Sequence, residues 1–494
     1  MSPRLVYAAA FVVWIGVGCL MAFDARRFSS IEPGMAASDM AARLDDLLAR
    51  TMDEYSVTGA AAGAVMDGDV IWSARRGQRS SEGAPVTGAT AFNLGSVSKP
   101  LAAWTVLTLA ETGAVDLDAP VSDYLLRWQL PESAFDPSGV TLRRLLRHTA
   151  GLNIHGYGGY EADEAAPEDA AALSETGYPV RQVIAPGVRR VYSGGGYTLL
   201  QLAIEDVTGL PFDHYARTAV FGPLDMASTG FTPQGLPEVS DAFDYYGRSI
   251  DPLHQVALAA TGAYASGDDL ERFLLAHFDG GGVLSAASLE QLLEPAPENG
   301  RYAMSYTREM TPAGALYGHG GNNSTWHAQI YVRPQTGDGF YFVTNSTSGA
   351  QLGLELTCAW RSWALEDSAS DLCAAERKLV HTLTFASIAT AGLALVIAAW
   401  LLDGLIRRRR RLSLRPRGRG PLRLTGRLFG FALACVLFLG CGVMFYTNVI
   451  YWRSGVTFID EIPLDEFEML MPAILAALGG SALALWSSPV RRSA

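Results

Sequence analysis

The sequence predicts an α/β protein with an antiparallel sheet flanked by helices, a helical subdomain, and four transmembrane helices, one N-terminal and three C-terminal. Strand-like segments occur near both ends of residues 38–375, with helix-like segments between them, which is typical of one antiparallel sheet closed by both ends of a domain. The whole chain has a hydrophobic fraction of 49% and a mean hydropathy of +0.15, and the apolar excess lies at its two ends. At 494 residues the chain should hold more than one domain.

The uncharged stretch from Leu5 to Phe23 is about as long as one bilayer crossing. It is longer than the apolar part of most cleaved signal peptides, and no small-residue cleavage site follows it closely. We therefore interpret residues 1–30 as an uncleaved N-terminal signal anchor. A cleaved signal peptide is the alternative.

Three further uncharged stretches in residues 376–494 predict a C-terminal membrane region, namely 383–402, 428–450 and 469–486. Ten arginines lie between the first two stretches, from Arg407 to Arg427, and acidic residues lie between the last two. The positive-inside rule makes the arginine loop cytoplasmic, which places both termini inside and residues 38–375 outside. The predicted location is the cell membrane, multi-pass, with the lipid bilayer as a partner and the catalytic domain on the extracytoplasmic side. The alternative interpretation of the arginine run, a nucleic-acid patch, does not fit its position between two spans.

The five cysteines divide between the apolar stretches and the exported part. Cys358 and Cys373 lie together at the end of that part, where oxidation is permitted, so we expect a disulfide between them. The sequence contains no CxxC pair and no HExxH motif, and its eight histidines show no ligand spacing. It therefore implies neither a metal site nor a cofactor.

Residues 38–375 have the composition of one globular mixed domain. Apolar residues recur at helical spacing from Met40 to Met52, which predicts an amphipathic helix. Residues 59–65 and 70–74 flank the turn Asp67-Gly68-Asp69 and predict a hairpin. A second hairpin is predicted near the far end, from residues 326–332 and 340–344.

The first catalytic candidates are Ser96 and Lys99, at the start of an apolar, helix-like run that ends at Gly113. One helical turn separates them, so the hydroxyl and the amine share a face. A desolvated lysine can take the serine proton and make the hydroxyl nucleophilic. Lys99 and Lys378 are the two lysines among 38 basic residues, and an arginine at position 99 could not give up its proton. The alternative is a surface lysine that follows a helix-capping serine.

A glycine-rich segment supplies the next candidates. Tyr192 and Gly194 precede a periodic helix that runs to about Val207. Such a loop lets the backbone come close to a ligand, and a phenol there can relay a proton between nucleophile and leaving group. The alternative is a tyrosine packed under a loop.

A third segment, from Tyr317 to Asn322, comes just before the predicted strand at Trp326. His319 can donate a hydrogen bond to a substrate carboxylate or to Tyr192, and glycines such as Gly321 let a substrate pair with the strand edge. The amide of Asn322 can face a developing oxyanion. Taken alone, a histidine among glycines carries little meaning.

These three segments, in this order, resemble the serine β-lactamase and penicillin-binding protein family, in its class C branch. Two further stretches agree with it. Residues 145–152 (LLRHTAGL) resemble the family's LLxHTSGL segment, and residues 260–270 resemble its glycine-rich stretch that ends in a helix-starting Asp-Leu. The resemblance covers roughly residues 40 to 350 and implies a β-lactamase/transpeptidase-like fold for residues 38–375.

The resemblance also implies roles for individual residues. It makes Ser96 the nucleophile, Lys99 and Tyr192 the base and proton relay, and the backbone amides of Ser96 and Asn322 the oxyanion hole. His319 belongs to the third motif, and His148 matches a position that we interpret as structural. Two departures matter. Gly194 stands where many members have the asparagine of Tyr-x-Asn, and His319-Gly320-Gly321 stands where β-lactamases usually have Lys-Thr-Gly.

Both departures disfavour an efficient β-lactamase. We expect a membrane-anchored serine hydrolase that forms a Ser96 acyl-enzyme with small amide or ester substrates, for example D-amino-acid peptides of the cell wall. An extracytoplasmic esterase is one alternative. A receptor that binds a wall fragment or a lactam without hydrolysis is another, although a pure binder does not need Ser96, Lys99 and Tyr192 together. The expected partner is a small-molecule or peptide substrate and not a nucleic acid, and the sequence leaves the oligomeric state open.

Overall fold

The structure is a computed structural model. It describes residues 34–364 except for 158, 162–163, 165–166, 175–178, 245, 299 and 324, together with 410–412 and 487–489. The chain divides into two compact units, and the larger one, Ser29–Ser370, contains the whole described domain. In the other unit the structure describes the strands β12 (Arg410–Leu412) and β13 (Ser487–Pro489), which pair antiparallel.

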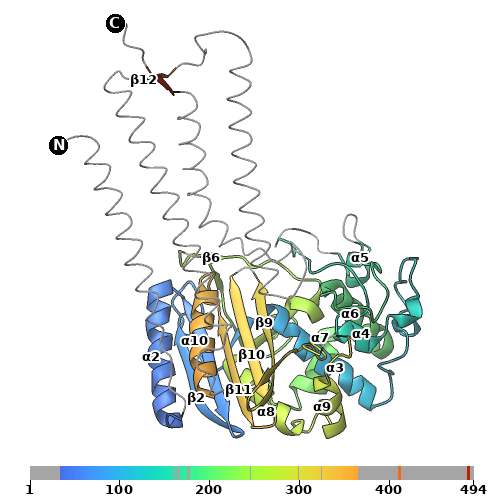
Figure 1. Ribbon diagram of the computed structural model, residues 1–494, viewed down its shortest axis with the longest axis horizontal. Helices are drawn as coiled ribbons and strands as arrows, with labels where there is room; N and C mark the ends of the chain where they lie inside the picture. Colours follow the sequence, from blue (N-terminus) through green and yellow to red (C-terminus); the bar gives the residue numbers. More distant parts are fainter. Residues whose placement is uncertain are drawn as a thin grey trace, which may run out of the picture. The chain divides into compact units, whose positions relative to one another are not determined.

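A six-stranded antiparallel sheet forms the centre of the larger unit, in the order β2-β1-β11-β10-β9-β8 (Figure 1). The first predicted hairpin, β2-β1, forms one edge of this sheet, and the second, β11-β10, lies in its middle. Strand β1 joins the two hairpins, because it pairs with both β2 and β11. The first and last strands of the domain are therefore neighbours, as the sequence predicts. The strand bounds are β1 Gly59–Met66, β2 Asp69–Gly77, β8 Thr307–Thr311, β9 Gly314–Asn323, β10 Trp326–Arg333 and β11 Asp338–Thr344.

Two terminal helices, α2 (Ala37–Tyr55) and α10 (Gly349–Ala364), lie side by side on one face of the sheet (Figure 1). The apolar positions of α2, such as Met40, Leu44 and Leu48, are fully buried there. They meet Leu352, Trp360 and other buried residues of α10 in one hydrophobic cluster. This burial explains why the periodic apolar run at the start of the domain folds as a helix.

The other face of the sheet carries the helical part of the domain (Figure 1). Helix α3 is buried nearly all round, with residues such as Trp104 and Leu101 at 0% exposure, so it forms the centre of the larger hydrophobic core. The helices are α3 Ser98–Glu111, α4 Leu142–Leu146, α5 Asp169–Ala172, α6 Gly194–Thr208, α7 Phe212–Ala216, α8 Gly267–Asp279 and α9 Ala286–Leu293. Short helical turns are η1 Gly95–Val97, η2 Val121–Asp123, η3 Pro137–Gly139, η4 Arg217–Phe221 and η5 Leu258–Gly262.

Two small sheets complete the fold. One has the order β4-β3-β7, with β3 Thr90–Asn93, β4 Glu238–Val239 and β7 Tyr264–Ser266. The other pairs β5 (Ala242–Phe243) with β6 (Ser249–Ile250). Strand β3 leads directly into η1 and α3, so the first small sheet fixes the start of the helix that carries Lys99.

The described residues contain no helix that is both long and apolar enough to cross a membrane. The predicted fold class included four transmembrane helices and is wrong on this point. Helix α2 has 19 residues but exposes charged side chains such as Asp46 and Arg50. The next longest described helix, α10, has 16 residues, fewer than the ~20 apolar residues that a crossing requires. The stretches predicted to span, 5–23, 383–402, 428–450 and 469–486, lie outside the described residues.

Cys358 is buried in α10 and is disulfide-bonded. The expected partner, Cys373, lies outside the described residues, so the pairing of these two cysteines stays a prediction.

His277 of α8 makes the stability of the domain depend on pH. Burial lowers the pKa of its imidazole to about 4, and the neutral ring lies between Phe273 O and the Tyr306 hydroxyl, each 2.7 Å away. The folded chain therefore binds fewer protons than the unfolded chain between pH 6.5 and 4, so stability is full above 6.5 and is lost as the pH falls through this window. When the pH falls from 7 to 5, the free energy of unfolding of His277→Gln should therefore decrease by about 2 kcal/mol less than that of the parent.

Urea unfolding at pH 7, 6 and 5 measures this difference. The slope with pH is the readout, because the substitution also changes the absolute stability. His214→Gln, on the exposed side of α7, is the matched control and should keep the parental slope. An unchanged slope in the His277 variant would show that this histidine is not buried in its neutral form.

Candidate active site

Ser96 lies in the tight turn η1 between β3 and α3, and side-chain and backbone contacts fix this turn. The Asn93 side-chain oxygen accepts hydrogen bonds from Gly95 N and from the Asn323 side chain, each at 3.0 Å. Gly95 has φ +50°, a left-handed conformation that favours glycine. The turn therefore holds Ser96 against β9, and Ser96 is only partly buried.

Lys99 follows one turn later and reaches back to the serine. Its Nζ lies 3.0 Å from Ser96 Oγ and 2.9 Å from the carbonyl oxygen of Ala260 in η5. The side chain is 1% exposed. Ser98 fixes the same turn, because its hydroxyl donates to Gly95 O and accepts from Ala263 N. The predicted pair is therefore in contact, and the surface-lysine alternative does not apply.

Tyr192 approaches the same serine from the loop before α6. Its hydroxyl donates to Ser96 Oγ at 3.0 Å, and Lys99 Nζ lies 4.8 Å from the centre of its ring. The nucleophile candidate thus has two groups within hydrogen-bond distance that can exchange its proton.

His148 and Ser193 hold the tyrosine in place. Ser193 caps α6 by accepting from Gly196 N, and its own N–H donates to His148 Nδ1 at 3.1 Å. The His148 ring centre lies 4.2 Å from that of Tyr192. Burial, with help from the nearby Arg190 and Lys99 cations, lowers the pKa of His148 well below its usual range. A neutral ring that accepts at Nδ1 carries its proton on Nε2, which fits the structural role expected for His148.

The third predicted segment forms the part of β9 that borders Ser96. Strand β8 pairs with β9 only as far as Gly318, whereas β10 pairs with it as far as Asn323. The stretch from His319 to Asn323 therefore has an edge that no described strand covers, and this edge meets the Ser96 turn.

Two glycines allow this close approach of backbones. A Cβ on Gly321 would lie 1.9 Å from Leu94 O and 3.0 Å from Ser96 N, and a Cβ on Gly95 would lie 2.8 Å from Asn322 N. The backbone amides of Ser96 and Asn322 therefore lie close together. This arrangement can offer two N–H donors to one carbonyl oxygen.

The remaining predicted site residues have different environments. His319 is 6% exposed, and its ring centre lies 6.3 Å from that of Tyr192. The side-chain oxygen of Asn322 lies 2.8 Å from Nδ1 of His327 on β10, which leaves its backbone for the Ser96 turn. Gly194, expected to bind substrate, is buried against the backbone of His155, and a Cβ there would lie 2.6 Å from His155 O.

Two residues around Tyr192 escaped the sequence analysis. The ring of His155 stacks on that of Tyr192, with centres 4.7 Å apart and planes 28° apart. The Arg190 guanidinium lies 5.3 Å from the Tyr192 ring and 4.2 Å from the Tyr302 ring. The position of Arg190, two residues before Tyr192, was a weak indication in the sequence that it lies at the site. The sequence gives no such indication for His155, because only the folded loop brings this residue to Tyr192.

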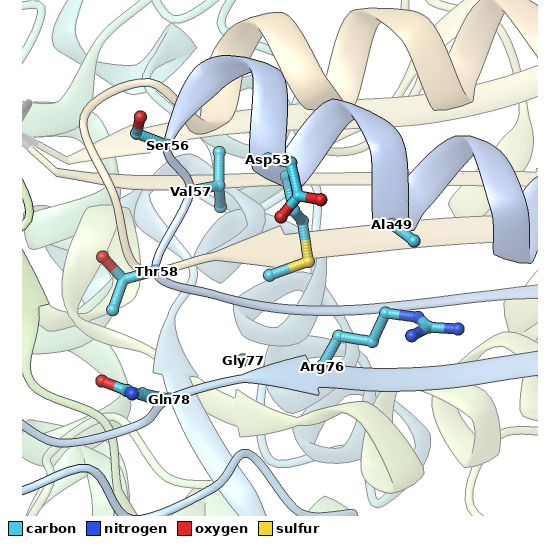
Figure 2. A pocket seen from close by; sticks show the side chains of 9 residues that line it. Ala49, Asp53, Ser56, Val57, Thr58, Arg76, Gly77 and Gln78 are labelled. Atoms are coloured by element: carbon cyan, nitrogen blue, oxygen red, sulfur yellow. The ribbon is translucent and has the colours of Figure 1, made fainter.

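A surface pocket of about 600 Å³ lies elsewhere, between the end of α2 and β2 (Figure 2). Figure 2 shows Asp53 on the helix and Arg76 on the strand at this pocket. Its lining includes none of the residues around Ser96. The described residues also contain no group of three or more acidic, histidine or cysteine side chains that could hold a metal ion.

Tyr192→Phe should lower the acylation rate of Ser96 by roughly 10²-fold to 10⁴-fold, because it removes one proton-relay hydroxyl. The ring contacts with His148 and His155 need no hydroxyl, so the melting temperature should stay near the parental value. The rate of labelling by a fluorophosphonate probe measures the first quantity and thermal unfolding the second. Tyr246→Phe, at an exposed tyrosine, is the control. Near-parental labelling of the Tyr192 variant would reduce this residue to a packing role.

Comparison with known proteins agrees with this geometry. Residues 44–358 match the family model described as Beta-lactamase. Among curated relatives, Penicillin-binding protein 4 of Amycolatopsis lactamdurans is 29% identical and the alignment covers 48% of this chain and 65% of the relative. The Putative penicillin-binding protein PbpX of Bacillus subtilis is 30% identical, and the alignment covers 44% of this chain and 53% of the relative. Esterase EstB of Burkholderia gladioli is 30% identical, and the alignment covers 41% of this chain and 55% of the relative. The chain thus spans about half to two thirds of the length of these relatives.

Solved structures agree on the fold. The octameric penicillin-binding protein homologue from Pyrococcus abyssi superimposes with a TM-score of 0.57 at 23% identity, over 66% of this chain and 79% of that one. SurE with D-Leu superimposes with a TM-score of 0.54 at 24% identity, over 66% and 75%. The family model matches more than half of the 494 residues. The chain belongs to the β-lactamase family.

Proposed function

We propose that this protein is a serine hydrolase that works through a covalent ester on Ser96. One observation carries the proposal: Ser96 Oγ lies 3.0 Å from both Lys99 Nζ and the Tyr192 hydroxyl. A serine becomes a nucleophile when a neighbouring base removes its proton, and this serine has two candidate proton acceptors in direct contact.

The steps follow from this geometry. Lys99 and Tyr192 take the Ser96 proton as Oγ attacks the substrate carbonyl, and the backbone N–H groups of Ser96 and Asn322 stabilise the oxyanion. The same proton then passes through Tyr192 to the leaving amine or alcohol, which departs and leaves the acyl group on Ser96. Water, deprotonated by the same pair, attacks the ester. The bond between the acyl carbon and Ser96 Oγ then breaks, the acid leaves, and the pair returns the proton to Oγ. The His319 ring lies beside that of Tyr192 and donates from Nδ1 to Gly320 O at 2.7 Å, so Nε2 of the neutral ring can accept a hydrogen bond at this side of the site.

The proposed substrates are small amides or esters outside the cytoplasm, for example D-amino-acid peptides of the cell wall, within the class C branch of the family. The penicillin-binding relatives support a peptide-like substrate. The uncovered β9 edge supports it as well, because an extended substrate can add to a strand edge through backbone hydrogen bonds. The disulfide-bonded Cys358 supports a location outside the cytoplasm, where such bonds persist.

An esterase is the second candidate. His319-Gly320-Gly321 differs from the Lys-Thr-Gly of most β-lactamases, and Esterase EstB is among the relatives. The ratio of turnover with matched amide and ester substrates separates the two candidates.

Gel labelling tests the acyl-enzyme. Membrane and soluble fractions are treated with a fluorescent fluorophosphonate or with a fluorescent penicillin, using the parent, Ser96→Ala, and the control Ser138→Ala at an exposed serine of η3. We expect the parent and the control to be labelled by the fluorophosphonate, and Ser96→Ala to remain dark. Equal labelling of Ser96→Ala would overturn the proposal. Penicillin labelling of the parent would add a lactam to the substrates.

A further inference from the structure

The end of β9 that lies against the Ser96 turn has little support from other strands. Strand β8 stops pairing with it at Gly318, and β9 ends one residue after Asn322, the proposed amide donor. Gly320 and Gly321 precede this donor, and glycine gives the backbone more conformational freedom than other residues do. Among the described residues, Asn322 therefore has strand support on one side, from β10, and side chains have to supply the rest.

The Asn322 side chain supplies a second support, through His327. The two residues lie directly opposite each other in the pairing of β9 with β10, so their side chains share one face of the sheet. The side-chain oxygen of Asn322 lies 2.8 Å from His327 Nδ1, and His327 Nε2 lies 3.0 Å from the carbonyl oxygen of Thr347. Gly321 has the opposite orientation, since a Cβ there would meet the Ser96 turn. The imidazole therefore joins Asn322 to Thr347 on the face of the strand that points away from Ser96.

The outer end of this bridge is fixed. Thr347 lies between β11 and α10, and its N–H donates to the carbonyl oxygen of Phe243 in β5 at 3.1 Å. The ring itself is closely packed, because His327 is 6% exposed and a Cβ on Gly349, at the start of α10, would lie 3.1 Å from its Cδ2 atom. The imidazole therefore has little freedom to turn away from Asn322.

The bridge can keep its hydrogen bonds in either protonation state of the imidazole. Burial lowers the pKa of His327 to about 4, so the ring is neutral near pH 7. A carbonyl oxygen can only accept, so the neutral ring donates from Nε2 to Thr347. Nδ1 can then accept from the NH2 group of Asn322, which a half turn of the side-chain amide brings to this position. A charged ring donates to both oxygens.

We propose that His327 is a positioning residue for the oxyanion hole, which fixes the Asn322 backbone amide beside Ser96 by linking the Asn322 side chain to Thr347. This inference rests on the proposed Ser96 acyl-enzyme. Oxyanion-hole donors act by being in place before the reaction, and a displacement of about 1 Å can cost roughly 10²-fold in rate. The contribution of His327 arises as charge develops on the substrate oxygen, so its loss should fall on kcat.

A double-mutant cycle on the full chain tests this with p-nitrophenyl butyrate. Asn322→Ala removes the linked side chain but keeps the backbone amide, and His327→Ala removes the bridge. Each single variant should lower kcat by roughly tenfold to 10²-fold, with KM within about twofold of the parental value. The double variant should lose no more than the larger single loss, because both changes break the same link. Gln329→Ala, on the same strand and face as His327, is the matched control and should keep the parental kcat and KM.

Parental kcat in Asn322→Ala would overturn the inference. Losses that add in the double variant would also overturn it, because a histidine needed only for packing would act independently of Asn322. Asn322 is exposed, so its truncation should leave the chain folded and tests the link even if His327→Ala folds poorly. Active-site titration with the fluorophosphonate gives the folded fraction of each variant. The proposed function fails by a different result, namely hydrolysis of the ester by Ser96→Ala at the parental rate.

Discussion

Lys99→Arg is expected to abolish acylation of Ser96 almost as fully as Lys99→Ala. The arginine keeps a positive charge but cannot give up its proton, so it cannot accept the one on Ser96. Lys99 Nζ lies 3.0 Å from Ser96 Oγ, and the side chain is 1% exposed, so no water reaches freely into its place. We expect both variants to lose about 10³-fold or more in the rate of fluorophosphonate labelling, which is the scale of losing an activating base.

Lys99→Met is the matched control for size, since it fills the same buried space without a charge. Thermal unfolding of the three variants separates loss of fold from loss of chemistry. The methionine variant should be folded and inactive. If Lys99→Arg kept more than about a tenth of the parental labelling rate, charge alone would explain Lys99, and its role as a base would be ruled out.

The helices and strands that could be predicted are those whose pattern of apolar residues is clear within a single segment of the sequence. The hairpin around Gly68 and the helix from Met40 to Met52 appear as β1–β2 and α2, because alternation and helical periodicity report burial directly. Strand β9 was not predicted as a strand, since four glycines within Gly314–Asn323 give it a low intrinsic preference. It forms because β10 pairs with it from Tyr317 to Asn323 and β8 pairs with it from Gly314 to Gly318. The short strands β3, β4 and β7 depend in the same way on partners distant in the sequence.

The same distinction applies to the site. Ser96 and Lys99 lie one helical turn apart in the sequence, so their contact could be predicted from spacing. Tyr192 was predicted as their partner from the glycine-rich loop and the family resemblance, and the structure brings its hydroxyl to Ser96. His155 could not be found in this way. Its place depends on contacts between the carbonyl oxygens of residues 153–155 and the start of α6, and on the glycine at position 194, which the sequence analysis had assigned to the substrate.

Gly321→Ala should lower kcat/KM by about 10²-fold or more, the cost of disturbing one oxyanion-hole donor. The new Cβ would lie 1.9 Å from Leu94 O and 3.0 Å from Ser96 N, so β9 and the Ser96 turn must move apart. The matched control is the same substitution at Gly320, the preceding residue of β9. A Cβ on Gly320 would meet only the side-chain oxygen of Gln329, at 2.8 Å, and that flexible side chain can move away. Gly320→Ala should therefore stay within a fewfold of the parental rate.

The loss in Gly321→Ala should fall on kcat more than on KM, because the two amides act on the charge that develops after Ser96 attacks. A substrate bound in its ground state gains little from them. Steady-state kinetics with p-nitrophenyl butyrate give both constants, and urea unfolding reports what the crowded strand costs in stability. Equal rates for the two alanine variants would contradict an oxyanion hole formed by Ser96 and Asn322. A rise in KM alone would move the role of this strand from the transition state to substrate binding along the β9 edge.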